Sequence, residues 1–317
     1  MNPIRRALIA AAGLALAVPA FAQDKTIRFI LPNATGSGVD AITRAAQPAL
    51  AKALGHPIVV DNQPGAGGIV GLQALARSPA DGFALSVVSN NVVIFPSVLK
   101  SLPFAMPDDF TPIAVVGYTP IVLVVNAKVP ANNAKELAAL LKQSNGELNY
   151  ASGGNGTILH LATEMFLDAS GTKARHIPYK GVGPMLTDLI GGQVQFATAA
   201  LPSVQQHLKS GALKAIGVAT AQRVAAAPEI PTFVEQGVDY QVEAWFAVVG
   251  PKGLPAAEVQ RVHAAVVSAF ADPAVKETMA KQGNVINVQP ADQAMPFFRS
   301  EMAKYAALVK KAGVEAQ

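Results

Sequence analysis

The sequence predicts an α/β protein of two domains, each built around a parallel sheet. Short β-rich apolar runs alternate with amphipathic helical segments, which is typical of parallel strands joined by crossover helices. The combination of strand, glycine-rich loop and helix start occurs at residues 26–55 and again near residues 148–159. The chain has 317 residues, and the part after an expected leader fits two domains of ordinary size.

The first 22 residues are expected to be a signal peptide. Arg5 and Arg6 form a positive region, Ala7–Val18 is an apolar stretch too short to span a bilayer, and Ala20-Phe21-Ala22 matches an A-x-A cleavage site. We expect a Sec-type leader cleaved near Ala22-Gln23 and a periplasmic mature protein. The sequence contains no cysteine, so we expect neither a lipid-modified cysteine nor disulfides.

The charge balance argues against nucleic acid binding. The leader holds two of the 25 basic residues and none of the acidic ones, which leaves 23 basic against 21 acidic residues. No stripe of Lys and Arg interleaved with aromatic residues is present in the sequence.

The first element of the mature chain is a strand followed by a loop and a helix. Ile27–Leu31 is short and apolar, Pro32 ends it, and apolar residues recur at helical spacing from Val39 to Leu50. The first N–H groups of such a helix lack internal partners and can face an anion. Glycines in the loop permit close approach, and the hydroxyls of Thr35 and Ser37 add donors. Alternatively, the loop is a plain connection in which Ser37 or Asp40 caps the helix.

Two further loops are expected at the same edge of the first sheet. A strand at residues 57–60 leads through residues 61–64 into the glycine-rich run 65–71 and a helix at 72–77. A strand at residues 84–88 ends at Ser89-Asn90-Asn91. Ligand sites of parallel sheets lie beyond the carboxyl ends of the strands, where these loops fall.

The second domain is expected to repeat the strand, glycine-rich loop and helix start of the first. Strand candidates at residues 113–116 and 121–125 and a capped helix at 132–142 precede a strand at 148–151. That strand enters a glycine-rich loop at residues 152–157 and a helix starting near Leu159. Two such loops, one in each domain, can hold one anionic molecule between them.

The remaining elements complete both domains. Strands are predicted at residues 175–179, 194–197, 215–219 and 244–249, helices at 184–190, 256–270, 273–282 and 290–312, and a loop of small residues at 198–203.

No nucleotide, metal or catalytic motif is complete. The glycine run at residues 65–71 has the wrong spacing for a dinucleotide fingerprint and lacks its acidic partner. His160 and Glu164 share a helix face, but no third metal ligand is spaced to join them. We therefore expect no cofactor, no metal and no catalytic residue, and a binding protein rather than an enzyme. Two alternatives stay open: an exported hydrolase using Ser37 or Thr157 with His160 as base, and a ligand sensor without a permease.

Several stretches, taken together and in order, resemble the Bug-type substrate-binding proteins of tripartite tricarboxylate transporters. They extend over essentially the whole mature length and comprise Pro32…Gly36…Asp40, Val59–Gly68, Ala80–Gly82, Leu148–Ser152 with Gly154–Thr157, His176–Gly181, Asp188–Gln193 and Pro228–Thr232. The resemblance implies a two-lobed periplasmic binding protein, a Venus flytrap of type II with two crossover strands. Lobe 1 would comprise residues 23–121 plus 243–317, and lobe 2 residues 122–242. It also implies a monomer that captures a small carboxylated metabolite and delivers it to a membrane permease.

The resemblance and the loops at the strand ends together define the expected ligand contacts. These residues are Asn33, Ala34, Thr35, Gly36, Ser37, Gly38, Asp40, Ser89, Asn90, Gly154, Asn155, Gly156, Thr157, His160, Ala199 and Ala200. Family members usually carry an aromatic residue where this chain has Asn33, and Asp-Asn where it has Ala199-Ala200. These departures leave the identity of the carboxylate open.

Overall fold

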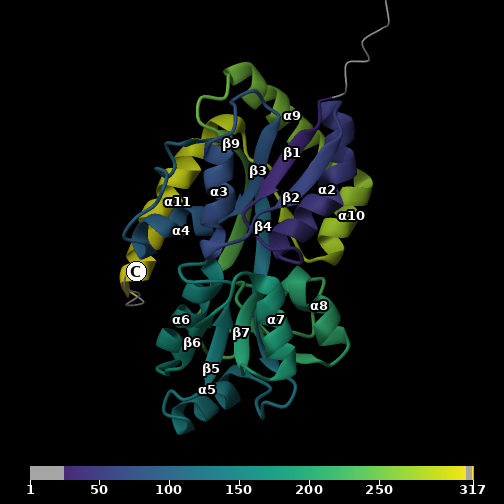
Figure 1. Cartoon of the computed structure of the whole chain (residues 1–317). Helices are drawn as coiled ribbons and strands as arrows, with labels where there is room; N and C mark the ends of the chain where they lie inside the picture. Colours follow the sequence, from purple (N-terminus) through teal and green to yellow (C-terminus); the bar gives the residue numbers. More distant parts are fainter. Residues whose placement is uncertain (1–24, 312–315, 317) are drawn as a thin grey trace, which may run out of the picture.

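The computed structural model describes residues 25–311 and residue 316, so the expected signal peptide lies outside the described residues. The chain forms two α/β lobes, with β1, β2 and β3 in one and β5, β6 and β7 in the other (Figure 1). Among the described residues, none of the helices combines the length and apolarity needed to cross a bilayer.

The sheet of the first lobe begins with three parallel strands. β1 (Ile27–Leu31) lies between β2 (Ile58–Asn62) and β3 (Ala84–Ser89) and runs parallel to both. The intervening helices are α2 (Gly38–Leu54), α3 (Ile69–Ala76), preceded by the short 3₁₀ helix η1 (Ala66–Gly68), and α4 (Asn91–Val98). The predicted βαβ pattern is confirmed here, whereas α4 was not predicted.

The second lobe repeats the parallel arrangement. β5 (Asn149–Ser152) pairs in parallel with β6 (Arg175–Pro178) and β7 (Phe196–Ala200). The helices are α5 (Ala134–Gln143), α6 (Ile158–Ser170), α7 (Val182–Gly191) and α8 (Leu201–Lys209). The predicted small-residue loop at 198–203 is wrong, because β7 continues to Ala200 and α8 starts directly afterwards with Pro202 in its first turn, where proline is favoured.

Two long strands connect the lobes. β4 (Phe110–Asn126) pairs antiparallel with β9 (Glu243–Pro251) over its first part and with β7 and β8 (Leu213–Val218) over its second. The prediction of two separate strands at 113–116 and 121–125 is therefore wrong. The apparent break contains Gly117, where a Cβ atom would lie 2.1 Å from the Val285 carbonyl oxygen of β10 (Val285–Ile286), so the glycine permits close pairing instead of ending the strand.

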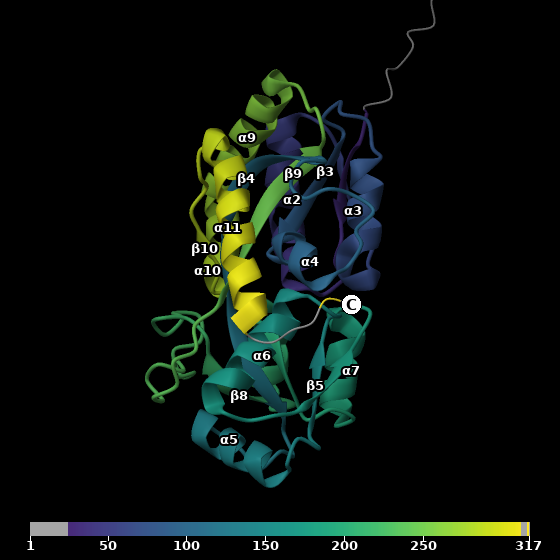
Figure 2. The same cartoon turned by 90° about the vertical axis from the view of Figure 1, so that its left-hand side faces the viewer.

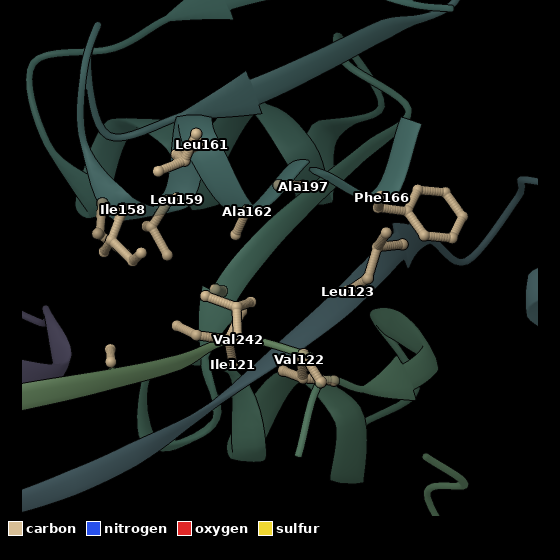
Figure 3. Close-up of a cluster of buried hydrophobic side chains, with 14 of the residues drawn as sticks. Ile121, Val122, Leu123, Ile158, Leu159, Leu161, Ala162, Phe166, Ala197 and Val242 are labelled. Atoms are coloured by element: carbon tan, nitrogen blue, oxygen red, sulfur yellow. The ribbon is translucent and has the colours of Figure 1, made fainter. Parts of the chain in front are cut away.

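Helices from the C-terminal part cover the first lobe. α9 (Ala256–Ala271) and α10 (Pro273–Lys281) pack against α2, while α11 (Ala291–Lys311) lies along α4 and β4 (Figure 2). One apolar cluster lies between the first sheet and α2, α9 and α10. A second, larger cluster fills the other lobe and continues into the first lobe through residues of α3, α4 and α11. Its residues from β4, α6 and β7 are drawn in part in Figure 3.

Candidate functional site

A cavity of about 70 Å³ lies between the lobes. Most of its lining comes from the starts of six helices and the loops before them, and the rest comes from β4 and β9. Three of these helices, α2, α3 and α4, follow strands of the first lobe, and the other three, α6, α7 and α8, follow strands of the second. Each helix N-terminus carries unpaired N–H groups and the positive end of the helix dipole. Six helix N-termini around one cavity favour a negatively charged ligand.

The first donor loop, residues 33–39, joins β1 to α2. Ser37 is the N-cap of α2 and accepts a hydrogen bond from Asp40 N at 3.2 Å. Gly36 has φ +83°, which only glycine adopts readily. The N–H groups of Gly38 and Val39 have no acceptor among the described residues, so they are free to donate into the cavity.

The second donor loop, residues 153–159, joins β5 to α6 in the same way. Thr157 is the N-cap, and its hydroxyl accepts from His160 N at 3.3 Å and donates to the Gly154 carbonyl at 2.8 Å. The Ile158 N–H donates to Asn91 Oδ1 of the opposite lobe at 2.8 Å. Within the described part of the chain, the Leu159 N–H has no acceptor, which leaves it as the donor of this helix start.

The rim of the cavity brings the lobes into contact through glycines. A Cβ atom on Gly38 would lie 2.9 Å from the Ala200 Cβ, and one on Gly181 would lie 2.7 Å from the Ala34 Cβ. A Cβ atom on Gly154 would meet the Gly67 Cα at 3.3 Å. The lobes are thus closed on each other, at a separation that larger side chains would prevent.

The side-chain charge at the cavity is positive. No Asp or Glu is among the described residues that line it, whereas the exposed Lys180 stands at its edge. Asp40 is buried in the first turn of α2 and accepts from Gly36 N at 3.0 Å, Arg44 Nε at 2.9 Å and Asn62 Nδ2 at 3.0 Å. Its carboxylate therefore holds the first donor loop in shape and is not directed at a ligand.

The structure brings about half of the expected ligand contacts to the cavity. Asn33, Ala34, Ser37, Gly38, Ser89, Thr157 and Ala200 line it. Outside the lining lie Thr35, Gly36, Asp40, Asn90, Gly154, Asn155, Gly156, His160 and Ala199. Asn90 is instead fully buried, accepting from Trp245 N at 2.9 Å and donating to the Tyr305 hydroxyl at 2.5 Å.

Sequence reasoning missed several residues that line the cavity. Among them are Asn91, Thr119, Lys180, Gly181 and Ser203. Gly181 is the N-cap of α7 in a further strand–glycine–helix unit, from β6 to α7, that the same rule could have found. Thr119 carries no local signal, because the sequence predicts a break between two strands there. Ser203 lies in the segment 198–203, for which the family resemblance implies a contributing loop, whereas the structure shows the end of β7 and the first turn of α8.

His160 lies behind the second donor loop rather than in the cavity. Its Nδ1 accepts from Gly156 N at 3.2 Å, and its ring stacks on His176 with centroids 4.0 Å apart. Burial lowers the pKa of His160 to about 4, and burial together with the neighbouring His160 lowers that of His176 to about 3. Tyr150 donates to Glu164 beside this pair.

Catalysis and metal binding each need particular side chains close together. No histidine is among the described residues that line the cavity, where a hydrolase built on Ser37 would need its base. Among the described residues, no group of three or more His, Asp or Glu side chains is placed to hold a metal ion.

Comparison with known proteins gives consistent matches. Residues 42–314 match the family described as tripartite tricarboxylate transporter family receptor. The chain is 34% identical to the protein BugT of Bordetella pertussis, covering 97% of this chain and 95% of that protein.

Solved structures of related proteins have a similar fold. The periplasmic binding protein BugD has a TM-score of 0.88 at 30% identity, covering 92% of this chain and 99% of BugD. R. palustris Rpa4515, solved with adipate, has a TM-score of 0.88 at 26% identity, covering 92% of this chain and 98% of that protein. The predicted fold class, a two-lobed type II solute-binding fold, is confirmed by this likeness.

Proposed function

Because the chain belongs to the family of tripartite tricarboxylate transporter receptors, we propose that it captures a small carboxylated metabolite between its lobes and delivers it to a membrane permease. The observation that carries the proposal is the meeting of six helix N-termini at one cavity without an acidic side chain in its lining. Helix N-termini stabilise carboxylates through N–H donors and the helix dipole. Adipate in the related R. palustris protein is also a carboxylate.

The proposal includes the cellular location, the oligomeric state and the lobe boundaries of the protein. It acts as a periplasmic monomer, exported by the leader cleaved near Ala22-Gln23, and it is not an enzyme. Lobe 1 comprises residues 23–121 plus 243–317, and lobe 2 residues 122–242. The ligand contacts are the expected residues that line the cavity, joined by Asn91, Thr119, Lys180 and Ser203.

Closure of the lobes is the signal that the permease reads. A ligand shifts the balance between open and closed forms only by contacts that it makes better in one of them. Donors from both lobes can reach one guest only when the lobes are closed, so the carboxylate favours the closed form. A sensor without a permease would use the same closure.

A thermal-shift screen of the mature protein tests the proposal. Small mono-, di- and tricarboxylic acids are each compared with their primary amides, which keep the shape and lose the charge. At about a hundredfold excess over Kd, a bound acid adds about 2.7 kcal/mol and raises Tm by roughly 5 °C. The proposal is contradicted if no acid stabilises the protein or if the amides stabilise it equally.

A further inference from the structure

Three buried polar atoms without a hydrogen-bond partner among the described residues belong to side chains that line the cavity. They are Asn33 Oδ1, Thr119 Oγ1 and Ser203 Oγ. They come from three separate parts of the chain: the first donor loop, the crossover strand β4 and the first turn of α8. Buried polar groups are normally paired, so three unpaired ones around one cavity favour a guest that can pair with them.

The chemistry of these atoms restricts the guest. An amide oxygen such as Asn33 Oδ1 only accepts, whereas the hydroxyls of Thr119 and Ser203 can donate or accept. A carboxylate satisfies the hydroxyls but supplies no donor for the amide oxygen. The guest therefore needs a group that donates a hydrogen bond in addition to its carboxylate.

The charges around the cavity decide which donor this is. An ammonium group would enter the positive field of six helix N-termini beside Lys180, without an acidic side chain in the lining to balance it. Asp40, the acidic residue of the first donor loop, is already occupied by Arg44, Asn62 and the Gly36 N–H. A neutral hydroxyl meets no such penalty, and it donates and accepts at once.

We propose that the cavity selects hydroxycarboxylates, and that Asn33, Thr119 and Ser203 are the specificity-determining residues that hold the ligand hydroxyl. This inference rests on the proposed function of the cavity as a carboxylate site and adds the substrate class. Asn33 accepts the hydroxyl proton, while the hydroxyls of Thr119 and Ser203 donate to its oxygen or to the carboxylate. The carboxylate itself is held by the N–H groups of the two donor loops.

Titration calorimetry with matched trios tests the substrate class. Lactate is compared with propionate and alanine, and malate with succinate and aspartate, so that hydroxyl, hydrogen and ammonium alternate on one carbon skeleton. We expect at least one hydroxy acid to bind about tenfold or more tightly than its deoxy partner, because the deoxy acid supplies no donor for the Asn33 amide oxygen. The amino acid of that trio should bind more weakly still.

Substitution of Thr119 tests the residues. Thr119→Val keeps the shape and removes the hydroxyl, so we expect affinity for the preferred hydroxy acid to fall about tenfold while affinity for its deoxy partner changes less than about twofold. Thr111→Val is the matched control, since Thr111 lies on the same strand but donates to the Pro251 carbonyl at 2.8 Å, outside the cavity lining. Ser203→Ala provides a second variant on another element if Thr119→Val does not fold.

The outcomes separate this inference from the proposed function. Equal affinity for hydroxy and deoxy acids, in the wild type, overturns the hydroxyl selection but keeps the carboxylate site. Tightest binding of the amino acids also overturns the selection. If no member of either trio binds and the wider carboxylate screen is equally silent, the carboxylate site itself is refuted.

Discussion

At the scale of single residues, His160 and His176 form a stacked pair directly behind the second donor loop. His160 Nδ1 accepts from Gly156 N at 3.2 Å, and His176 Nε2 lies 2.6 Å from Ser152 Oγ. One contact fixes a residue of the second donor loop, and the other fixes the last residue of β5, directly before that loop. The pair is best accommodated in its neutral form, because burial lowers the pKa of both rings and a charge on one opposes a charge on the other.

The depressed pKa values predict a loss of stability in mild acid. Between the ordinary histidine pKa of 6.5 and the folded values of about 4 and about 3, the unfolded chain binds protons that the folded chain does not, so the free energy of unfolding falls as pH falls. The slope is about 1.4 kcal/mol per pH unit for each histidine inside this window. Glu164, whose pKa is raised by burial, acts in the opposite direction.

Denaturant unfolding from pH 7.5 to pH 5 measures this effect. In His176→Gln the fall in unfolding free energy should be shallower than in the wild type, since one of the two protonation sites is gone. His207→Gln, which replaces a histidine of α8 outside the pair, should keep the wild-type slope. An unchanged slope in His176→Gln would show that the pair does not govern the acid response.

Residues whose role depends on local backbone could be predicted from sequence. Ser37 and Thr157 were placed correctly at helix starts, because a small polar residue after a glycine and before an apolar repeat is a local N-cap signal. The orientation of Asp40 and His160 depends on partners elsewhere, such as Asn62 and His176, and no local pattern contains that information.

At the scale of elements, α2 contains an internal proline and still runs from Gly38 to Leu54 without interruption. Pro48 has no N–H to donate, so the Arg44 carbonyl lacks its helical partner. The residue is exposed, on the side of the helix away from the buried Ala46 and Leu50. Packing of the apolar face against α9 and α10 offsets this local defect.

Replacing the proline should therefore stabilise the protein. We expect Pro48→Ala to raise the free energy of unfolding by about 1–3 kcal/mol, measured by chemical denaturation, without a change in ligand affinity. Pro273→Ala is the matched control, because Pro273 is also exposed but occupies the first turn of α10, where no N–H is needed. A gain no larger than that of the control would mean that α2 tolerates the proline at no cost.

Helices in which apolar residues recur at regular spacing could be predicted well from sequence. Strands whose length depends on partners far away in the sequence could not. α9, α10 and α11 lie within two residues of their predicted bounds because each presents an apolar stripe to the core. β4 was divided in two because Gly117 and Pro120 look like strand breakers. In the fold, Gly117 faces the backbone of β10 and Pro120 pairs with Glu243 where β4 changes partners.

At the scale of the whole molecule, the two lobes meet through small residues on both sides of the cavity. Gly38 and Ala200 come from opposite lobes, and a Cβ atom on Gly38 would lie 2.9 Å from the Ala200 Cβ. Gly38 is in a helix and needs no special backbone conformation, since its φ is not in the left-handed region. The absence of a side chain therefore serves closure rather than the loop itself.

A methyl group at residue 38 should hinder closure of the lobes without lowering the stability of the protein. We expect Gly38→Ala to weaken binding of the stabilising carboxylate about tenfold or more, while Tm without ligand stays equal or rises slightly, because alanine favours the helix. Gly191→Ala, at a helical glycine with nothing within 4 Å of the added atom, should leave affinity unchanged. Ala200→Gly in the Gly38→Ala background should restore affinity, and failure to do so would contradict the closure account.

The arrangement of the whole molecule could be predicted only in part. Two donor loops at strand ends could be identified in sequence, and the family resemblance supplied the two-lobed arrangement. The starts of α3, α4, α7 and α8, or the residues directly before them, also line the cavity, and this follows from the topology of both sheets and the connection through β4 and β9. No single stretch of sequence contains that convergence.

The most direct test of the central claim is an amide NMR spectrum of the mature protein with and without the carboxylate that stabilises it best. Charged hydrogen bonds to backbone N–H groups move their proton signals downfield. We predict downfield shifts for Gly38 and Val39 of one lobe and Leu159 of the other in the same titration, with one shared Kd. Shifts limited to one lobe, or limited to exposed residues around Lys180, would contradict a carboxylate held between two sets of helix N-termini.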